Sequence, residues 1–232
     1  MSLRGVEGVR RAGTLVCWLF RGNRPVAVLG CVLVCFDLGF MLLHLAALLW
    51  LPGNRMLYID VDRGYAEIFQ ALKYTMAALL LCGAAATRKR WSLVLWLPVL
   101  AVLLLDDLFQ GHESAGSYVH RTLLPQAGDW VQDAGAVCTL LLGALAVGAL
   151  LWVGYTRASS STRWVYRVLV ALLVLLAVFT VGVGLLGSLV PERTVLADVL
   201  TLVEDGGEML VVSGFVVVAA RLLGPLPAAQ GV

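Results

Sequence analysis

The sequence has few charged residues for its length. Only 14% of its 232 residues are Asp, Glu, Lys or Arg, whereas soluble domains average about a quarter. Hydrophobic residues make up 60% of the chain, and its mean hydropathy is +0.90. This composition excludes a soluble domain of this size and indicates an all-α integral membrane protein that crosses the bilayer several times.

Histidine and cysteine are scarce as well. A three-histidine zinc site would need His44, His112 and His120 together, so the chain departs from intramembrane hydrolases whose zinc is held by several histidines. No Glu-x-x-His motif of the carboxylate-bridged metal proteins occurs. The five cysteines are odd in number and form no Cys-x-x-Cys pair, so the sequence indicates neither a disulfide framework nor a redox motif.

Long polar segments are also lacking, and apolar runs fill most of the chain. A helix needs about 20 predominantly apolar residues to cross the hydrocarbon. Six segments meet this length: 25–51, 66–86, 91–110, 131–155, 164–190 and 195–220. The sequence therefore predicts a bundle of six transmembrane helices forming a single domain, 25–222, after a basic cytoplasmic segment, 1–24, and before a loose tail, 223–232.

The basic residues are distributed unevenly over the two sides of these segments. With the N-terminus in the cytoplasm, twelve of the 17 Lys and Arg residues fall on the inner side and four on the outer side. Since cytoplasmic loops carry the excess of positive charge, both termini are predicted to be cytoplasmic. The inner basic residues are spread over four separate segments, which suits anionic lipid headgroups and argues against nucleic acid.

Six carboxylates lie inside the apolar segments and away from the outermost residues at their ends: Asp37, Asp106, Asp107, Glu204, Asp205 and Glu208. Lys73 is the only lysine within a span that could balance them. An ionised carboxylate in hydrocarbon is very unfavourable unless it is paired, protonated, solvated or bound to a cation. The excess of acid over base therefore predicts a site that holds protons, a metal ion or water.

Polar residues recur at helical spacing on four of the spans, so that those of one span share a face. The stripes are Asp37, Met41 and His44; then Glu67, Gln70 and Tyr74 with Lys73 beside them; then Asp106, Gln110 and Glu113 flanked by Asp107 and His112; and finally Glu204, Asp205 and Glu208. If the first, second, third and sixth spans are neighbours, these stripes converge on one cavity open to the outside. The fourth and fifth spans carry almost no ionisable residue and are expected to act as scaffold.

The candidate site follows from these stripes. Its predicted cation ligands are Asp106, Asp107, His112, Glu113, Glu204 and Glu208. Residues expected around them, or to share protons with them, are Asp37, His44, Glu67, Gln70, Lys73, Gln110 and Asp205. Carboxylates with an imidazole suit divalent metals such as Mn²⁺, Fe²⁺ or Zn²⁺, so a divalent metal ion is the expected cofactor if one is bound.

Three functions remain compatible with this pattern. The first is the binding of a proton or metal ion for transport or conduction. The second is metal-dependent catalysis on a lipid or a redox partner. The third is a structural role, in which the acidic groups form hydrogen-bonded pairs that hold the bundle or a membrane complex together. Membrane lipids are expected partners in every case, and a homo-oligomer or a membrane complex is compatible with all three.

Three short segments carry a resemblance to a known group of proteins. They are Asp62-Arg-Gly-Tyr-Ala-Glu-Ile-Phe-Gln70, Asp106-Asp-Leu-Phe-Gln-Gly-His-Glu113 and Glu204-Asp-Gly-Gly-Glu208. They resemble segments of uncharacterised bacterial multi-pass membrane proteins, which carry an acidic pair before His-Glu on one span and a Glu-rich turn on a later one. The resemblance implies that these residues form one site and that the protein lies in the bacterial plasma membrane.

Overall fold

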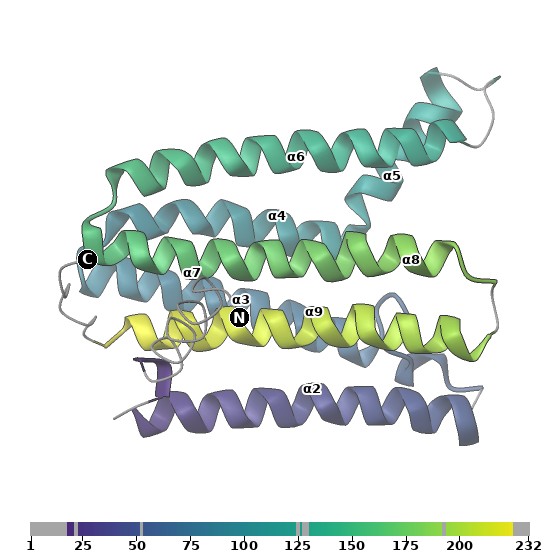
Figure 1. The fold of residues 1–232 in the computed structure, drawn as a ribbon, viewed down its shortest axis with the longest axis horizontal. Helices are drawn as coiled ribbons and strands as arrows, with labels where there is room; N and C mark the ends of the chain where they lie inside the picture. Colours follow the sequence, from purple (N-terminus) through teal and green to yellow (C-terminus); the bar gives the residue numbers. More distant parts are fainter. Residues whose placement is uncertain are drawn as a thin grey trace, which may run out of the picture.

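The structure, a computed structural model, describes residues 18–20, 23–51, 53–123, 126, 130–191 and 194–224. This part of the chain forms helices and turns and contains no strand, as the composition predicts. The helices run side by side along one axis (Figure 1). Their bounds are α2 Arg24–Trp50, η1 Arg55–Leu57, α3 Tyr65–Thr87, η2 Trp91–Leu95, α4 Trp96–Phe109, α5 Gly111–Tyr118, η3 Val119–Leu123, α6 Trp130–Arg157, α7 Ser160–Ala177, η4 Val178–Val183, α8 Gly184–Ser188 and α9 Val195–Leu222.

Each predicted span corresponds to one of these helices or to a continuous series of them. Five helical segments are long and apolar enough to cross a membrane: Arg24–Trp50, Tyr65–Thr87, Trp91–Phe109, Ala134–Arg157 and Ser160–Gly187. The helix α9 is 28 residues long, but its acidic residues keep it out of this apolar set. A protein with five such helices fits a membrane, and the sixth span stays a prediction.

Local sequence explains where several helices begin and end. The side chain of Asn23 accepts a hydrogen bond from Val26 N–H at 3.3 Å, and Pro25 follows it at the start of α2. Gln110 has φ 47° and ψ 52°, a left-handed conformation that interrupts the helix between α4 and α5. The predicted third span therefore ends where expected, whereas the short helix α5 that follows was not predicted.

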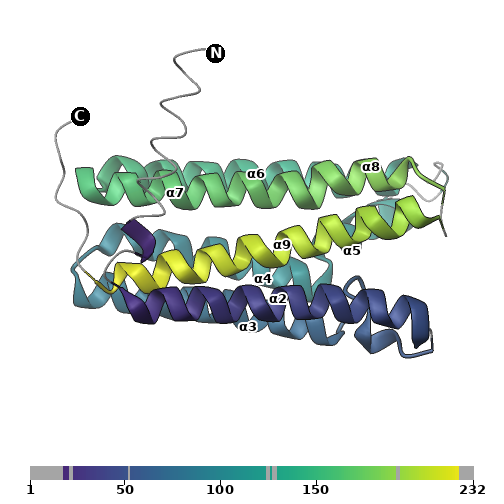
Figure 2. The ribbon, with the colours of Figure 1, turned by 60° about the horizontal axis from the view of Figure 1, so that its bottom comes forward.

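The helix α9 lies at the centre of the bundle. It contacts α2, α3, α7, η4 and α8, and Figure 2 shows it between the layer of α6, α7 and α8 and the helices α2 and α3. Its second half is almost wholly buried, from Met209 to Leu222. The neighbouring face of α3 is buried at helical spacing and carries small residues such as Ala77 and Ala84, which let the two helices approach closely.

Some helices bury their apolar side chains in a common core, whereas α6 exposes them on the outside of the bundle. The main hydrophobic core gathers aromatic and aliphatic side chains of α3, α4, α7 and α9, including Leu81, Trp96 and Phe215. The helix α6 instead exposes large apolar side chains such as Leu142, Leu145 and Trp152. An outward-facing apolar surface of this kind suits contact with lipid.

Basic side chains close one end of the bundle. The guanidinium of Arg88 donates to Leu223 O at 2.8 Å, and that of Arg90 donates to Leu222 O at 3.2 Å. The first turn of α2 and the last turn of α9 lie at this same end (Figure 1). Acidic side chains gather at the opposite end, where α2 ends and α9 begins.

Candidate functional site

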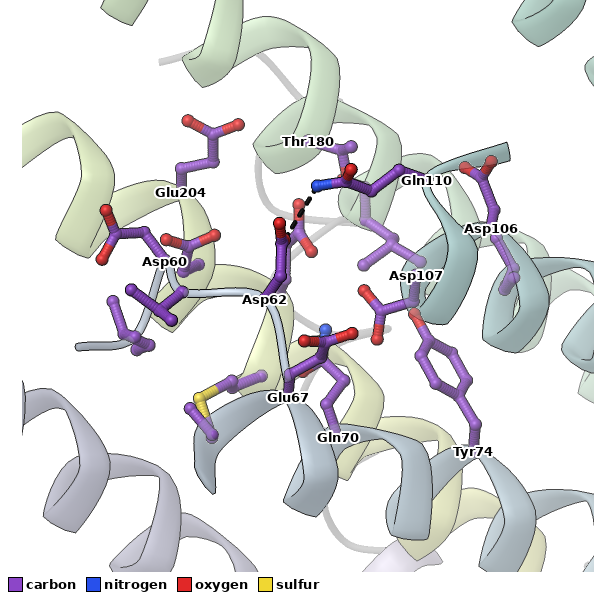
Figure 3. A pocket seen from close by; sticks show the side chains of 18 residues that line it. Asp60, Asp62, Glu67, Gln70, Tyr74, Asp106, Asp107, Gln110, Thr180 and Glu204 are labelled. Carbon is purple, nitrogen blue, oxygen red and sulfur yellow. Dashed lines mark hydrogen bonds between the residues drawn. The ribbon is translucent and has the colours of Figure 1, made fainter. Parts of the chain in front are cut away.

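A cavity of about 390 Å³ opens among the helices at the acidic end. Its walls come from the segment that joins η1 to α3, from α3, α4 and α9, and from the junction of α7 with η4 (Figure 3). Eight carboxylates line it: Asp60, Asp62, Glu67, Asp106, Asp107, Glu204, Asp205 and Glu208. The described lining contains no lysine, arginine or histidine, so its wall carries an excess of acidic groups.

Exposure decreases from the mouth of this cavity to its floor. Asp60 and Asp62 are exposed, and Asp107 and Glu208 are half-buried. Gln70, at the floor, is only 6% exposed, and Met209 is 2% exposed. The cavity is therefore open at one end and closed by packed side chains at the other.

Two hydrogen bonds fix the segment that forms the mouth. The side-chain Nε2 of Gln110 donates to Asp62 Oδ1 at 2.8 Å, which joins this segment to the break between α4 and α5 (Figure 3). The backbone N–H of Arg63 donates to the carboxylate of Glu67, in the first turn of α3. A carboxylate in that position also compensates the positive end of the helix dipole.

The Glu204-Asp-Gly-Gly-Glu208 segment of α9 presents its carboxylates to the cavity and its glycines to neighbouring helices. Its carboxylates line the cavity, while its two glycines meet other helices. A Cβ on Gly206 would lie 2.6 Å from the Met41 side chain, and one on Gly207 would lie 2.3 Å from the Phe179 ring. A side chain at position 207 would meet the Phe179 ring, so glycine there allows α9 to approach η4, whereas the flexible Met41 side chain could shift away from a residue at position 206. The close approach of α9 to η4 positions the acidic wall.

The fifth span contributes to the site, although the sequence suggested only a scaffold. Thr180 lies in the π-helical segment η4 and lines the cavity together with Leu176. Its hydroxyl donates to Leu176 O at 3.1 Å and is also a hydrogen-bond partner of Glu208. Widened helical turns of this type are frequent at functional sites.

The floor of the cavity holds two acceptor atoms that are not satisfied. The amide of Gln70 hydrogen-bonds with both Asp107 and Glu208. Gln70 Oε1 and Asp107 Oδ2 are buried, yet neither has a hydrogen-bond partner among the described residues. Buried acceptors are normally paired, so these two atoms are available to accept hydrogen bonds from a donor that enters the cavity.

Asp37 and Lys73 form a separate buried pair below the cavity. Lys73 Nζ lies 2.8 Å from Asp37 Oδ1, and the two side chains are 1% and 0% exposed. The ammonium also donates to Met209 O at 2.8 Å, and Ser213 Oγ donates to Asp37 Oδ2 at 2.5 Å. Lys73 is therefore used to neutralise Asp37 and to join α2, α3 and α9, and it does not line the cavity.

His44 supports the mouth from behind. Its Nδ1 accepts the backbone N–H of Ile59 at 3.1 Å, and the ring is buried. Because that nitrogen is an acceptor, the 4.0 Å approach to Asp60 is not an ion pair. His44 holds the segment that leads into the cavity and does not belong to its lining.

The structure thus brings together most of the residues chosen from the sequence. The cavity lining includes Glu67, Gln70, Asp106, Asp107, Gln110, Glu204, Asp205 and Glu208. It does not include Asp37, His44 or Lys73, and the side chains of His112 and Glu113 lie outside the described part of the structure.

Four polar lining residues were not in the candidate set: Asp60, Asp62, Tyr74 and Thr180. Tyr74 shares the helical face of Glu67 and Gln70, and that spacing was the signal that could have added it. The other three lie in a loop or in a π-helical segment. Helical periodicity gives no signal for such positions.

The described residues contain no group of three His, Cys, Asp or Glu side chains placed to hold one metal ion. The carboxylates surround the cavity without converging on one point. The expectation of a directly ligated divalent metal therefore stays a prediction.

One family model matches the chain, over residues 40–222, which include every described wall of the cavity. Its description is "Domain of unknown function (DUF8692)". No curated protein and no solved structure matches the chain.

Proposed function

Because the chain belongs to the DUF8692 family, whose description names no activity, we propose from the cavity itself that the protein binds cations in a membrane and carries them across it. The observation that carries this proposal is the acidic lining, with eight carboxylates and no basic side chain among the described wall residues. If all were ionised, the wall would hold eight like charges in a site partly screened from water. A cavity of this kind attracts and concentrates cations.

Mutual repulsion supports the same conclusion. Asp107 on α4 interacts electrostatically with Glu67 on α3 and with Asp205 and Glu208 on α9. Such groups cannot all remain ionised without counter-charge, so they share protons or bind a cation. Gln70 Oε1 and Asp107 Oδ2, which have no partner among the described residues, are likewise available to a proton donor or a cation.

The closed floor favours transport over open conduction. Below Gln70 and Tyr74, the side chains of Ala77 and Leu81 on α3 are buried, and the core continues across α4 and α9. A cation that enters from the mouth could leave at the other end only after the helices that close the floor rearrange. We therefore favour alternating exposure of the cavity, as in carriers, over a continuous pore.

The two alternatives have less support. A metalloenzyme would place several ligands around one metal, and the described residues contain no such group. A purely structural role would pair the acidic groups, as Asp37 is paired with Lys73. Asp107, Glu204, Asp205 and Glu208 instead line a hollow of about 390 Å³, which a structural role does not require.

The placement of the protein follows from the charge distribution. We propose cytoplasmic termini and an outward-facing cavity, because the basic residues gather toward the opposite end. The resemblance of three segments to bacterial multi-pass membrane proteins supports a bacterial plasma membrane location. Labelling of single cysteines, introduced at Asp62 and at Lys89, with a membrane-impermeant reagent on intact cells tests this orientation. Reaction at position 62 and not at position 89 is expected, and the reverse pattern would contradict it.

A binding and flux experiment tests the function. Purified protein is titrated with Mg²⁺, Ca²⁺, Mn²⁺ and 1,4-diaminobutane by calorimetry, and uptake of the same cations and of protons is measured in proteoliposomes. We expect binding and flux that Asp107→Asn and Glu208→Gln each reduce at least tenfold. Asp198→Asn is the matched control, because Asp198 lies on α9 outside the cavity lining.

Two results would contradict the proposal. If the wild-type protein neither bound nor moved any of these cations, cation handling would be wrong. If binding occurred but was equally strong in all three variants, the cavity would not be the site.

A further inference from the structure

The size of the cavity bears on which cation it accepts. Divalent metal ions are held by oxygen ligands at about 2.0–2.6 Å, which requires several carboxylates to meet at one point. The described carboxylates do not form such a group. A volume of about 390 Å³ instead lies in the range of small-molecule sites, roughly 300–1,000 Å³.

Apolar side chains occupy the wall between the acidic groups. They are Ile59, Val61, Ala66, Leu103, Leu176 and Met209. A hydrated metal ion presents water on every side and gains nothing from contact with them. A polymethylene chain loses unfavourable contact with water there, at roughly 0.8 kcal/mol per buried CH₂ group.

The acidic groups stand on two walls rather than in one cluster. Asp106 and Asp107 lie on α4, and Glu204 lies opposite them on α9 (Figure 3). Glu67, from α3, turns toward Asp107 between these walls. Separate anionic walls with apolar surface between them match a ligand whose positive charges are separated by apolar spacers.

The two acceptors at the floor also favour a ligand that carries hydrogen-bond donors. Gln70 is 94% buried, being 6% exposed, and its Oε1 has no partner among the described residues. An ammonium group offers three N–H donors on one charge. It can therefore donate to Gln70 Oε1 and Asp107 Oδ2 while its charge is balanced by the surrounding carboxylates.

We propose that the cavity recognises a linear organic cation with two or more ammonium groups joined by methylene spacers, a polyamine. One ammonium group binds at the floor, at Gln70 and Asp107, and its chain lies along the apolar wall. A further ammonium group binds toward the mouth, near Asp60 and Asp62. This assignment rests on the proposed cation-binding function and names its substrate class.

Charge-matched ligands test the assignment with the intact wild-type protein. Full-length protein in lipid nanodiscs is titrated with butylamine, 1,4-diaminobutane, spermidine and MgCl₂. We expect 1,4-diaminobutane to bind at least tenfold more tightly than Mg²⁺, although both carry two charges, and at least tenfold more tightly than butylamine. Spermidine is expected to bind more tightly still.

The outcomes separate this inference from the proposed function. If Mg²⁺ binds as tightly as 1,4-diaminobutane or more tightly, the polyamine assignment is wrong and cation binding stands. If none of the four ligands binds, both are wrong. Equal affinity for butylamine and 1,4-diaminobutane would also overturn the assignment, because a second ammonium group would then have no site.

A variant at the floor tests the directional contact. Gln70→Leu keeps the approximate volume but removes both the amide oxygen and the amide donor to Asp107 and Glu208, so we expect at least fivefold weaker binding of 1,4-diaminobutane and a smaller loss of affinity for Mg²⁺. Asp198→Asn should change neither affinity. Equal weakening of both ligands by Gln70→Leu would show a general effect on the cavity and would contradict the contact.

Discussion

Two groups of ionisable side chains lie among the helices, and they differ in how their charge is balanced. Asp37 and Lys73 contact each other directly, are almost fully buried and have further partners on α9. The described wall of the cavity contains eight carboxylates and no basic side chain, and two buried acceptors on its floor have no described partner. The first group is complete within the protein, whereas the second requires a ligand or protons.

This difference separates structure from function within one helix bundle. A buried charge that is paired contributes to holding α2, α3 and α9 in place, and its loss leaves the partner uncompensated. A set of facing carboxylates works against stability in the absence of counter-charge and is retained for what it binds. Substitutions in the first group should therefore lower the free energy of unfolding, whereas substitutions in the second group should weaken ligand binding and change stability little.

The largest expected effect comes from breaking the buried pair. Lys73→Met leaves Asp37 buried without its counter-charge, and we expect a loss of about 3–5 kcal/mol in the free energy of unfolding. Denaturant unfolding of the detergent-solubilised protein measures it. The double variant Asp37→Leu/Lys73→Met should recover part of the loss, and wild-type stability in Lys73→Met alone would remove the distinction between the two groups.

Ligand binding should stabilise the protein through the second group only. A cation at a concentration 100 times its dissociation constant adds about 2.7 kcal/mol to the free energy of unfolding. We expect this gain in the wild type and its absence in Asp107→Asn/Glu208→Gln under the same conditions. Thermal unfolding with and without the ligand is the measurement, and an equal gain in both proteins would place the binding site elsewhere.

The packing that positions the acidic wall can be tested at Gly207 of α9. Gly207→Ala places a Cβ 2.3 Å from the Phe179 ring, and overpacking of this kind destabilises by about 1–3 kcal/mol. Gly143→Ala on α6 is the control, since nothing lies within 4 Å of its added Cβ. The control should be neutral or slightly stabilising, so equal losses in both variants would contradict the close approach of α9.

The smallest effect on stability is expected in the cavity itself. Without ligand, Asp107→Asn removes one of several like charges, so we expect a free energy of unfolding within about 1 kcal/mol of the wild type, or somewhat above it. Comparison of denaturant midpoints in cation-free buffer checks this. A loss as large as that of Lys73→Met would mean that the cavity carboxylates are structural too.

Much of the helical architecture could be predicted from the sequence, because apolar runs of about 20 residues have few stable alternatives in a bilayer. The stripes on the second, third and sixth spans also led to eight residues of the cavity, since helical spacing fixes which side chains share a face. The first span was assigned to the same cavity, but its polar residues have other partners. Asp37 is paired with Lys73, and His44 binds the backbone of Ile59.

The remaining lining residues depend on conformations that helical periodicity does not encode. Asp60 and Asp62 enter the cavity because the segment before α3 folds over its mouth and is held by Gln110. Thr180 faces the cavity from a π-helical segment, where the spacing of side chains differs from that of an α-helix. Its hydroxyl is neither charged nor part of a stripe, so the fifth span seemed to be scaffold.

By itself, the sequence determined the class of the protein, the extent of its helices and the excess of buried acid over base, because these depend only on composition and on local periodicity. Only the tertiary structure decided which acidic group takes the one buried lysine and which groups are left facing a cavity. That choice depends on contacts between residues far apart in the chain, such as Asp37, Lys73 and Ser213. The packing of α9 against its neighbours brings these residues together, and no pattern within a single helix contains that information.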